Sequence, residues 1–372
     1  MKKTLVAAAA LAATGAFAQV TLSGNLDVAF GSQGAIQQQR SNTNSSSAMT
    51  FAGTEALNND LSASFTLTTE IDLQKGQGGS TSTGAATSTT GQTYDMWNRA
   101  ANLALASKSM GTLRLGRQND AWWETQGQFN TTGSNSFGVG ILIATQSNMA
   151  ATGIVTHGYG STNATNAGWT GTTFTYVSGV SYATPNLNGF TAKIQQNAAD
   201  YSLTTGQTVN PGAALSLNFD GGAFKAAVAT SNKSGTDGLV GHTLTAYGAS
   251  YTFGQTTINA ITNKSAFTNA YAAAYTDSSA VGLGVTYRFN PSFDASLSYG
   301  TLTNDEDTTK KSTLIGVVGR YSLSKRTSVY AGVGNINNEG TGNVSSALWS
   351  YTTGATANAV TTSSMLGIRH QF

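Results

Sequence analysis

The strongest constraint in this sequence is an alternation of apolar and polar residues at every second position, which recurs along most of its length. Residues 20–30, 61–73, 190–195, 281–289 and 293–299 all follow it. Successive residues of a β-strand point to opposite faces of the sheet, so each of these segments is predicted to be a strand with one apolar face. Helical periodicity is hard to find. The chain is therefore expected to be almost entirely β.

The connections between the predicted strands alternate between short and long. Sixteen strands can be placed, starting near residues 20, 47, 60, 96, 111, 172, 188, 212, 222, 243, 255, 280, 292, 312, 326 and 361. The short turns centre on residues 58–59, 109–111, 185–186, 220–221, 254, 290–291 and 324–325. The long connections cover residues 32–46, 74–95, 119–171, 198–211, 231–242, 264–279, 302–311 and 336–360.

This asymmetry distinguishes between the classes of all-β protein. A β-sandwich also alternates, but nothing requires a sandwich to place every long connection at the same end. An up-and-down barrel of an outer membrane has short periplasmic turns on one rim and long extracellular loops on the other. The sequence therefore predicts a transmembrane 16-stranded antiparallel β-barrel.

The composition fits such a barrel better than a soluble enzyme. Charged residues make up 10 % of the chain, against about 25 % in ordinary soluble domains. Disordered chains are poor in aromatic residues, whereas this one has 14 Tyr, 15 Phe and 5 Trp. A closed barrel needs an apolar face only toward lipid and can be polar toward a watery interior. The mean hydropathy of −0.15 is therefore compatible with a membrane position.

The first residues predict export. Lys2 and Lys3 precede an apolar run, and Ala16-Phe17-Ala18 ends it, which is typical of a signal peptide cleaved before Gln19. The run is shorter than the roughly 20 residues of a membrane helix. We therefore predict a signal peptide at residues 1–18 and one barrel domain at residues 19–372. Loss of the two lysines brings the formal charge from +2 to zero, and no basic patch indicates nucleic-acid binding.

Several stretches, in order along the chain, resemble the general diffusion porins of Gram-negative outer membranes, in particular the trimeric porins of beta-proteobacteria. They are VTLSGNLDVAF, TFAGTEALNNDLSASFTLTTEIDL, WNRAANLALASKSMGTLRLGRQ, VSYATPNLNGFTAKI, YGASYTFG, RYSLSKRTSVYAGV and GIRHQF. The resemblance implies a sixteen-stranded homotrimer that passes small hydrophilic solutes and ions by diffusion. It also implies contact with outer-membrane lipid and lipopolysaccharide.

The connection at residues 119–171 is the longest, and loops of that length are uncommon unless they are functional. The resemblance implies that this third loop folds into the barrel and narrows the pore; a loop lying over the outer mouth is the alternative. Its aromatic and aliphatic residues, among them Trp122, Trp123, Phe129 and the run Ile141 to Ile143, either pack inside the barrel or form stacking platforms for a solute. Aromatic residues near strand ends are expected in interfacial girdles, with the trimer contact as the alternative for some of them: Trp97, Tyr176, Tyr182, Tyr287 and Tyr299.

Strand parity predicts which charged residues face the lumen. Arg or Lys on the lipid face costs about 2–4 kcal/mol at the membrane midplane, so inward placement is expected, with a position near a rim as the alternative. The predicted lumen residues are Asp27, Glu70, Asp72, Arg114, Lys193, Lys225, Arg288, Asp294, Arg320 and Arg369. Six of these are basic and four are acidic.

The resemblance adds Arg99 and Arg117 to these candidates. Both share parity with leucines, so there is either a bulge or a position beyond the hydrocarbon or in a subunit interface. The third loop adds only the carboxylates Asp120 and Glu124 and has no Lys or Arg. Other positions that are often basic in the family are neutral here, namely Ala48, Ala52 and Ser181. We therefore expect weak ion selectivity with a slight anion leaning and size as the main filter.

Catalysis, metal binding and a cofactor are not expected. The chain has only His157, His242 and His370, with no G-x-S-x-G motif and no metal-ligand spacing. A channel specific for a sugar or an aromatic solute is the alternative function. The chain ends inside a predicted strand, on Phe372. In a closed barrel this strand pairs with the first one, and the terminal aromatic is similar to the recognition signal of the barrel-assembly machinery.

Overall fold

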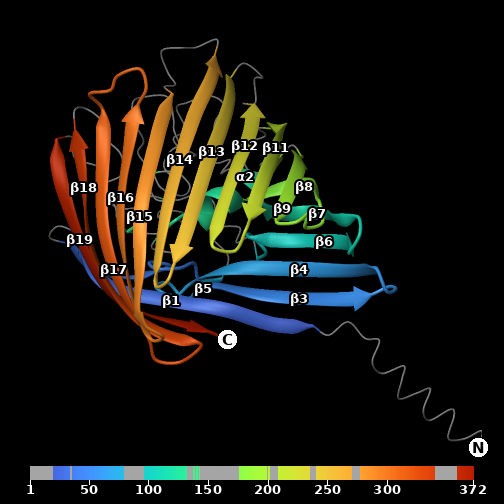
Figure 1. Ribbon diagram of the computed structural model, residues 1–372, viewed down its shortest axis with the longest axis horizontal. Helices are drawn as coiled ribbons and strands as arrows, with labels where there is room; N and C mark the ends of the chain where they lie inside the picture. Colours follow the sequence, from blue (N-terminus) through green and yellow to red (C-terminus); the bar gives the residue numbers. More distant parts are fainter. Residues whose placement is uncertain are drawn as a thin grey trace, which may run out of the picture.

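A computed structural model of the chain shows one closed antiparallel barrel with a short helix, α2, inside it (Figure 1). The structure describes residues 20–33, 36–78, 96–131, 137–138, 140, 142, 176–198, 200–201, 208–234, 240–269, 277–339 and 358–372. The predicted signal peptide at residues 1–18 lies outside these residues. In the described part of the chain, no helix is long and apolar enough to cross a membrane.

Sixteen strands form the wall of the barrel. They are β1 (Thr21–Gln33), β3 (Ala48–Ala56), β4 (Leu61–Asp72), β6 (Ala100–Ser107), β7 (Gly111–Asn119), β8 (Tyr176–Ala183), β9 (Phe190–Asn197), β11 (Thr208–Asp220), β12 (Phe224–Ser234), β13 (Val240–Phe253), β14 (Thr256–Asn269), β15 (Ser278–Asn290), β16 (Phe293–Asn304), β17 (Lys311–Ser322), β18 (Thr327–Glu339) and β19 (Ala359–Gln371). Three short strands extend the hairpins, namely β2 (Ile36–Ser41), β5 (Gln77–Gly78) and β10 (Asp200–Tyr201). The predicted 16-stranded barrel is confirmed.

The barrel closes where its first and last strands pair. β1 and β19 run antiparallel from Asn25 opposite Gln371 to Gln33 opposite Ser363. Beyond this ladder, Gly24 and Phe372 exchange two backbone hydrogen bonds of 3.0 and 3.1 Å. The terminal residue is therefore part of the wall, and its backbone leaves no open sheet edge.

Short polar residues build the tight turns at the rim where the connections between strands are short. The side-chain oxygen of Asn58 accepts hydrogen bonds from the backbone N–H groups of Asp60 and Leu61. Asn290 accepts in the same way from Ser292 and Phe293. Asn and Ser favour turns because their side chains can hydrogen-bond the backbone two or three residues along the chain. The seven short turns lie where the sequence predicts them.

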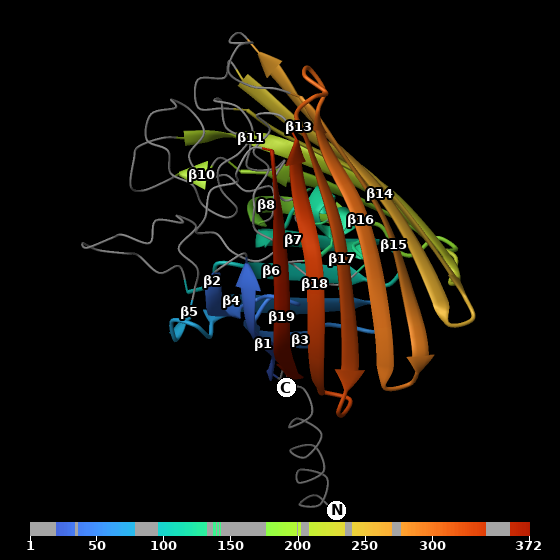
Figure 2. The same cartoon turned by 90° about the vertical axis from the view of Figure 1, so that its left-hand side faces the viewer.

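The two faces of the wall differ as the alternation predicts. Outward-pointing apolar side chains are exposed, and Leu283 in the middle of β15 is 53 % exposed. Inward-pointing neighbours such as Ala280 on β15 and Ser298 on β16 are buried. In Figure 2 the strands β14–β18 form a tall wall on one side of the barrel. An apolar outer belt around a more polar interior is the arrangement that lipid requires.

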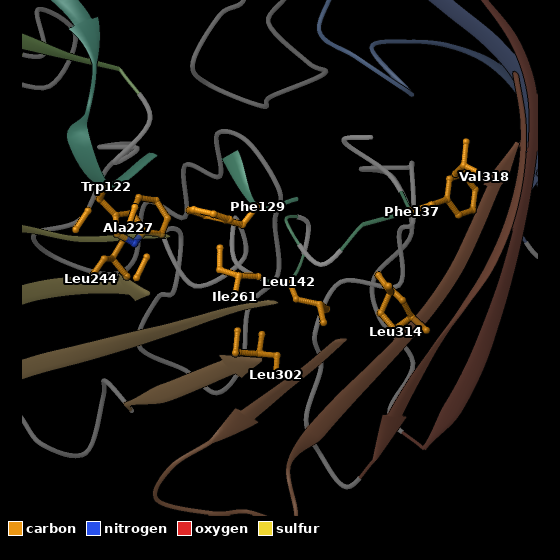
Figure 3. Packing of buried hydrophobic residues seen from close by; sticks show 14 of the residues in the cluster. Trp122, Phe129, Phe137, Leu142, Ala227, Leu244, Ile261, Leu302, Leu314 and Val318 are labelled. Atoms are coloured by element: carbon orange, nitrogen blue, oxygen red, sulfur yellow. The ribbon is translucent and has the colours of Figure 1, made fainter. Parts of the chain in front are cut away.

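The third loop folds into the lumen, as predicted. Asp120 caps the first turn of α2 (Ala121–Gln128) by accepting a hydrogen bond of 2.9 Å from the backbone N–H of Trp122. Four loop residues are buried against the inner faces of the wall strands, namely Trp122, Phe129, Phe137 and Leu142 (Figure 3). Trp122 and Phe129 therefore pack inside the barrel. The rest of the predicted loop, residues 132–136, 139, 141 and 143–171, lies outside the described residues.

Candidate functional site: the narrowed lumen

A cavity of about 490 Å³ lies between α2 and the inner face of strands β3 to β9. Most of its lining is polar, and alternation directs most of the strand side chains in it inward. The lining residues are Ala48, Thr66, Thr68, Arg99, Ala100, Asn102, Thr112, Arg114, Gln118, Asn119, Glu124, Tyr176, Ser181, Ala183 and Lys193. The helix contributes Glu124 to this set, so the infolded loop forms one side of the passage.

Two of the three lining cations are paired with carboxylates. The guanidinium of Arg99 lies 2.9 Å from a carboxylate oxygen of Glu70 on β4. The ammonium of Lys193 on β9 lies 2.9 Å from Glu124, and it also donates a hydrogen bond of 3.2 Å to the backbone carbonyl of Asn119. The second pair connects the wall to the helix across one edge of the cavity.

Arg114 is the third lining cation, and its surroundings differ. It points inward from β7, as predicted, and donates a hydrogen bond of 3.3 Å to the side-chain oxygen of Asn102. In the described part of the chain, no carboxylate lies within ion-pair distance of it. Its positive charge is therefore the one most available to a passing ion.

Arg99 and Arg117 meet at the ring of Tyr176. Their guanidinium carbons lie 5.6 and 5.8 Å from the ring centre, within the range of cation–π contacts. The expectation that Tyr176 belongs to an interfacial girdle is wrong, because this ring lines the cavity instead. Arg99 reaches the lumen despite its parity because it precedes the first residue of β6. Arg117 donates to the backbone carbonyl of Asn98 and is not among the lining residues.

Asp27 and Asp120 are predicted lining candidates that the structure buries completely. Asp27 points inward from β1, but residues 42–47 cover it; its carboxylate accepts hydrogen bonds from Thr43, Asn44 and Tyr330. Asp120 accepts a hydrogen bond of 2.8 Å from Ser231 besides its bond to the helix. Neither carboxylate faces the passage, because parity gives the direction of a side chain and not what covers it.

The other predicted lumen charges lie away from the cavity. Arg320 and Asp294 form an ion pair of 2.9 Å, and Lys225 pairs with Asp220 at 2.7 Å. Arg369 donates a hydrogen bond of 2.6 Å to Asn25. Asp72 accepts hydrogen bonds from backbone N–H groups of the turn after β4. Arg288 is exposed and lies opposite Asp294 in the strand ladder.

A search for charged residues alone does not find the neutral polar residues of the lining, among them Asn102, Gln118 and Tyr176. Asn102 and Gln118 could have been found, because Gln118 shares parity with Arg114 and Asn102 has parity opposite to the outward leucines. No signal in the sequence indicates Tyr176. Among the described residues, no group of His, Cys, Asp and Glu could hold a metal ion.

A closed barrel of sixteen strands, narrowed by its third loop, is compatible with one family of membrane proteins in particular. A family model described as Gram-negative porin matches residues 4–341. The chain belongs to the Gram-negative porin family. The family and the barrel make it an outer-membrane porin, a channel through which solutes diffuse passively. The resemblance seen in the sequence is confirmed.

Solved porin structures share the fold at low sequence identity. The anion-selective porin from Comamonas acidovorans has a TM-score of 0.78 at 20 % identity, over 96 % of this chain and 100 % of that one. OmpF from Salmonella typhi, in complex with daunomycin, has a TM-score of 0.65 at 13 % identity, over 95 % and 98 %. The trimer form of OmpT from Vibrio cholerae reaches 0.64 at 14 %, over 95 % and 99 %. A search of curated proteins found no match.

Proposed function

We propose that this porin is a general diffusion channel for small hydrophilic solutes, with size as its main filter and a weak preference for anions. The observation that carries the proposal is the lining of the cavity. It holds three cations against one carboxylate, Glu124, and its remaining residues are neutral. Polar groups on every side suit water-filled passage rather than tight capture of one ligand.

The preference for anions is expected to be weak because most of the charge is compensated. Arg99 and Lys193 each have a carboxylate at 2.9 Å, which leaves Arg114 to attract anions. The similar Comamonas porin is described as anion-selective, which supports the direction of this preference. A catalytic role is not part of the proposal, since the porin family and its fold are those of channel proteins.

Single-channel recording in planar bilayers tests the proposal. A series of uncharged solutes of increasing size should pass up to one size limit, with no saturable block by any of them. A KCl gradient should give a small reversal potential of the sign that indicates chloride preference. A strong preference for potassium would refute the proposed preference for anions. A protein that does not conduct would refute the proposal that it forms a diffusion channel.

The alternative, a channel specific for a sugar or an aromatic solute, has lost its main support in the sequence. Trp122 and Phe129, which could have formed a stacking platform, are buried against the wall. Tyr176 does line the cavity, but its ring already contacts two guanidinium groups. Saturable block of the current by one solute would nevertheless favour this alternative over general diffusion.

We further propose that the porin is a homotrimer embedded in lipid and lipopolysaccharide, exported with a signal peptide at residues 1–18. The trimer form of the similar OmpT supports the oligomeric state. The position of Phe372 in the closing seam supports insertion by the barrel-assembly machinery through the last strand. Native mass determination of the protein in detergent tests the trimer, and N-terminal sequencing of the exported protein should begin at Gln19.

A further inference from the structure

The inner wall opposite the cavity carries a row of glycines at the positions where the third loop touches it. They lie on β13, β15, β17 and β18, always on the inward parity, and are Gly248, Gly284, Gly316, Gly332 and Gly334. A Cβ atom added at Gly248 or Gly284 would overlap the side chain of Phe129 or Thr131. At Gly316 it would overlap the backbone carbonyl oxygen of Phe137.

Phe137 contacts three of these glycines, Gly316, Gly332 and Gly334. Its ring lies 2.9 Å from the Cβ position of Gly334 and 3.3 Å from that of Gly332, and its side chain is fully buried. Phe129 is buried to the same degree beside Gly248. Leu314 and Val318, the inward neighbours of Gly316, pack around Phe137 (Figure 3). The loop and the wall therefore fit by shape over four strands.

We infer that these glycines are sockets that hold the third loop against the far wall and so set the size limit of the channel. Hydrogen bonds between the loop and the wall, such as those of Trp122 and Thr131, could be replaced by hydrogen bonds to water. A bulky side chain at a socket would instead occupy the space of the loop and exclude it. The loop crosses from β7 to the strands β13–β18, which leaves the passage on the side of β3–β9. This inference deepens the proposed function, because it names the residues that fix the size filter.

The sharpest test is the substitution Gly316→Ala, whose added methyl group would clash with backbone rather than with a flexible side chain. Displacement of the loop should raise the single-channel conductance and let larger uncharged solutes pass. Gly319→Ala is the matched control: it lies on the same strand but on the outward parity, and the nearest atom to its Cβ position is 3.6 Å away. The control should conduct like the unmodified porin.

The reciprocal variant Phe137→Ala removes the side chain and leaves the socket intact, so it should raise conductance and the size limit in the same direction. Folding of each variant is checked first by its heat-modifiable migration on gels. Acrylamide quenching of tryptophan fluorescence reports the loop independently of transport, because Trp122 is fully buried in the docked loop. Quenching should rise in Gly316→Ala and in Phe137→Ala but not in the control.

The inference would be overturned if Gly316→Ala and Phe137→Ala both folded and left conductance, size limit and quenching unchanged. An equal change in Gly319→Ala would do the same, since the effect would then reflect the strand and not the socket. Failure of the proposed function looks different, because the unmodified porin would then fail to pass a range of uncharged solutes in the first place.

Discussion

Replacing Arg114 with glutamine should weaken the anion preference of the channel by an amount that the cavity dimensions set. A sphere with the cavity's volume of about 490 Å³ has a radius of about 5 Å, so an ion at its centre lies about that far from the guanidinium. In water the charge then contributes about 0.8 kcal/mol, and screening at 0.1 M salt reduces this to about 0.5 kcal/mol. The local ratio of anions to cations should fall about fivefold.

The reversal potential in a KCl gradient measures this change directly. Arg114→Gln should shift it toward the potassium side, and the shift should shrink as the salt concentration rises, because screening grows. The double variant Lys193→Gln with Glu124→Gln is the matched control. It removes one positive and one negative charge from the same cavity and should leave the reversal potential nearly unchanged.

An unchanged reversal potential in Arg114→Gln would refute the assignment of selectivity to the cation that has no carboxylate partner in the described part of the chain. A shift in the double variant as large as that in Arg114→Gln would refute the compensation argument, since paired charges would then act as strongly as an unpaired one. Conductance of both variants in symmetric salt serves as the check that the pore remains open.

One deletion and three substitutions test the barrel itself. Deletion of Phe372, which bonds Gly24 at the seam, should lower the yield of inserted barrels while leaving the conductance of those that form unchanged; normal yield would contradict this role. Asp27→Ala should lower the free energy of unfolding in urea by about 1–3 kcal/mol for each buried donor left without a partner. Tyr330→Phe removes one of those donors and should lower the free energy of unfolding by less than Asp27→Ala. Leu283→Arg should cost about 2–4 kcal/mol in folding into lipid vesicles, because its side chain points outward near the middle of β15.

The wall of this barrel could be predicted from the sequence because each strand carries its own signal. Every predicted strand begins within four residues of the observed one. Asn and Ser mark the turns. Within a strand, alternation predicts the face of a side chain, and the inward direction predicted for Arg114 and Lys193 agrees with their place in the cavity lining. These are local properties. Because one face of the wall meets lipid and the other meets water, irregular packing rarely overrides them.

The contents of the lumen were harder to predict because they depend on contacts between distant segments. Parity directed Asp27 inward, but it could not show that residues 42–47 cover the carboxylate. Tyr176 lies opposite Asn119 at the start of β8, where alternation no longer decides the direction of a ring. The socket glycines are a few among the 43 of the chain, and only the docked loop distinguishes them from the others.

The two sides of the lumen carry different kinds of residue. The side of β3–β9 carries the charges of the passage, including Arg114, whereas the side of β13–β18 carries the glycines and apolar residues that seat the loop. Under the proposed function, charge selectivity and pore width would therefore be set by different residues on opposite walls. It follows that they should change independently: Arg114→Gln should alter selectivity and leave the size limit unchanged, and Gly316→Ala should do the reverse. If each variant changed both properties together, the loop would have to respond to the charges it faces, and shape alone would not hold it in place.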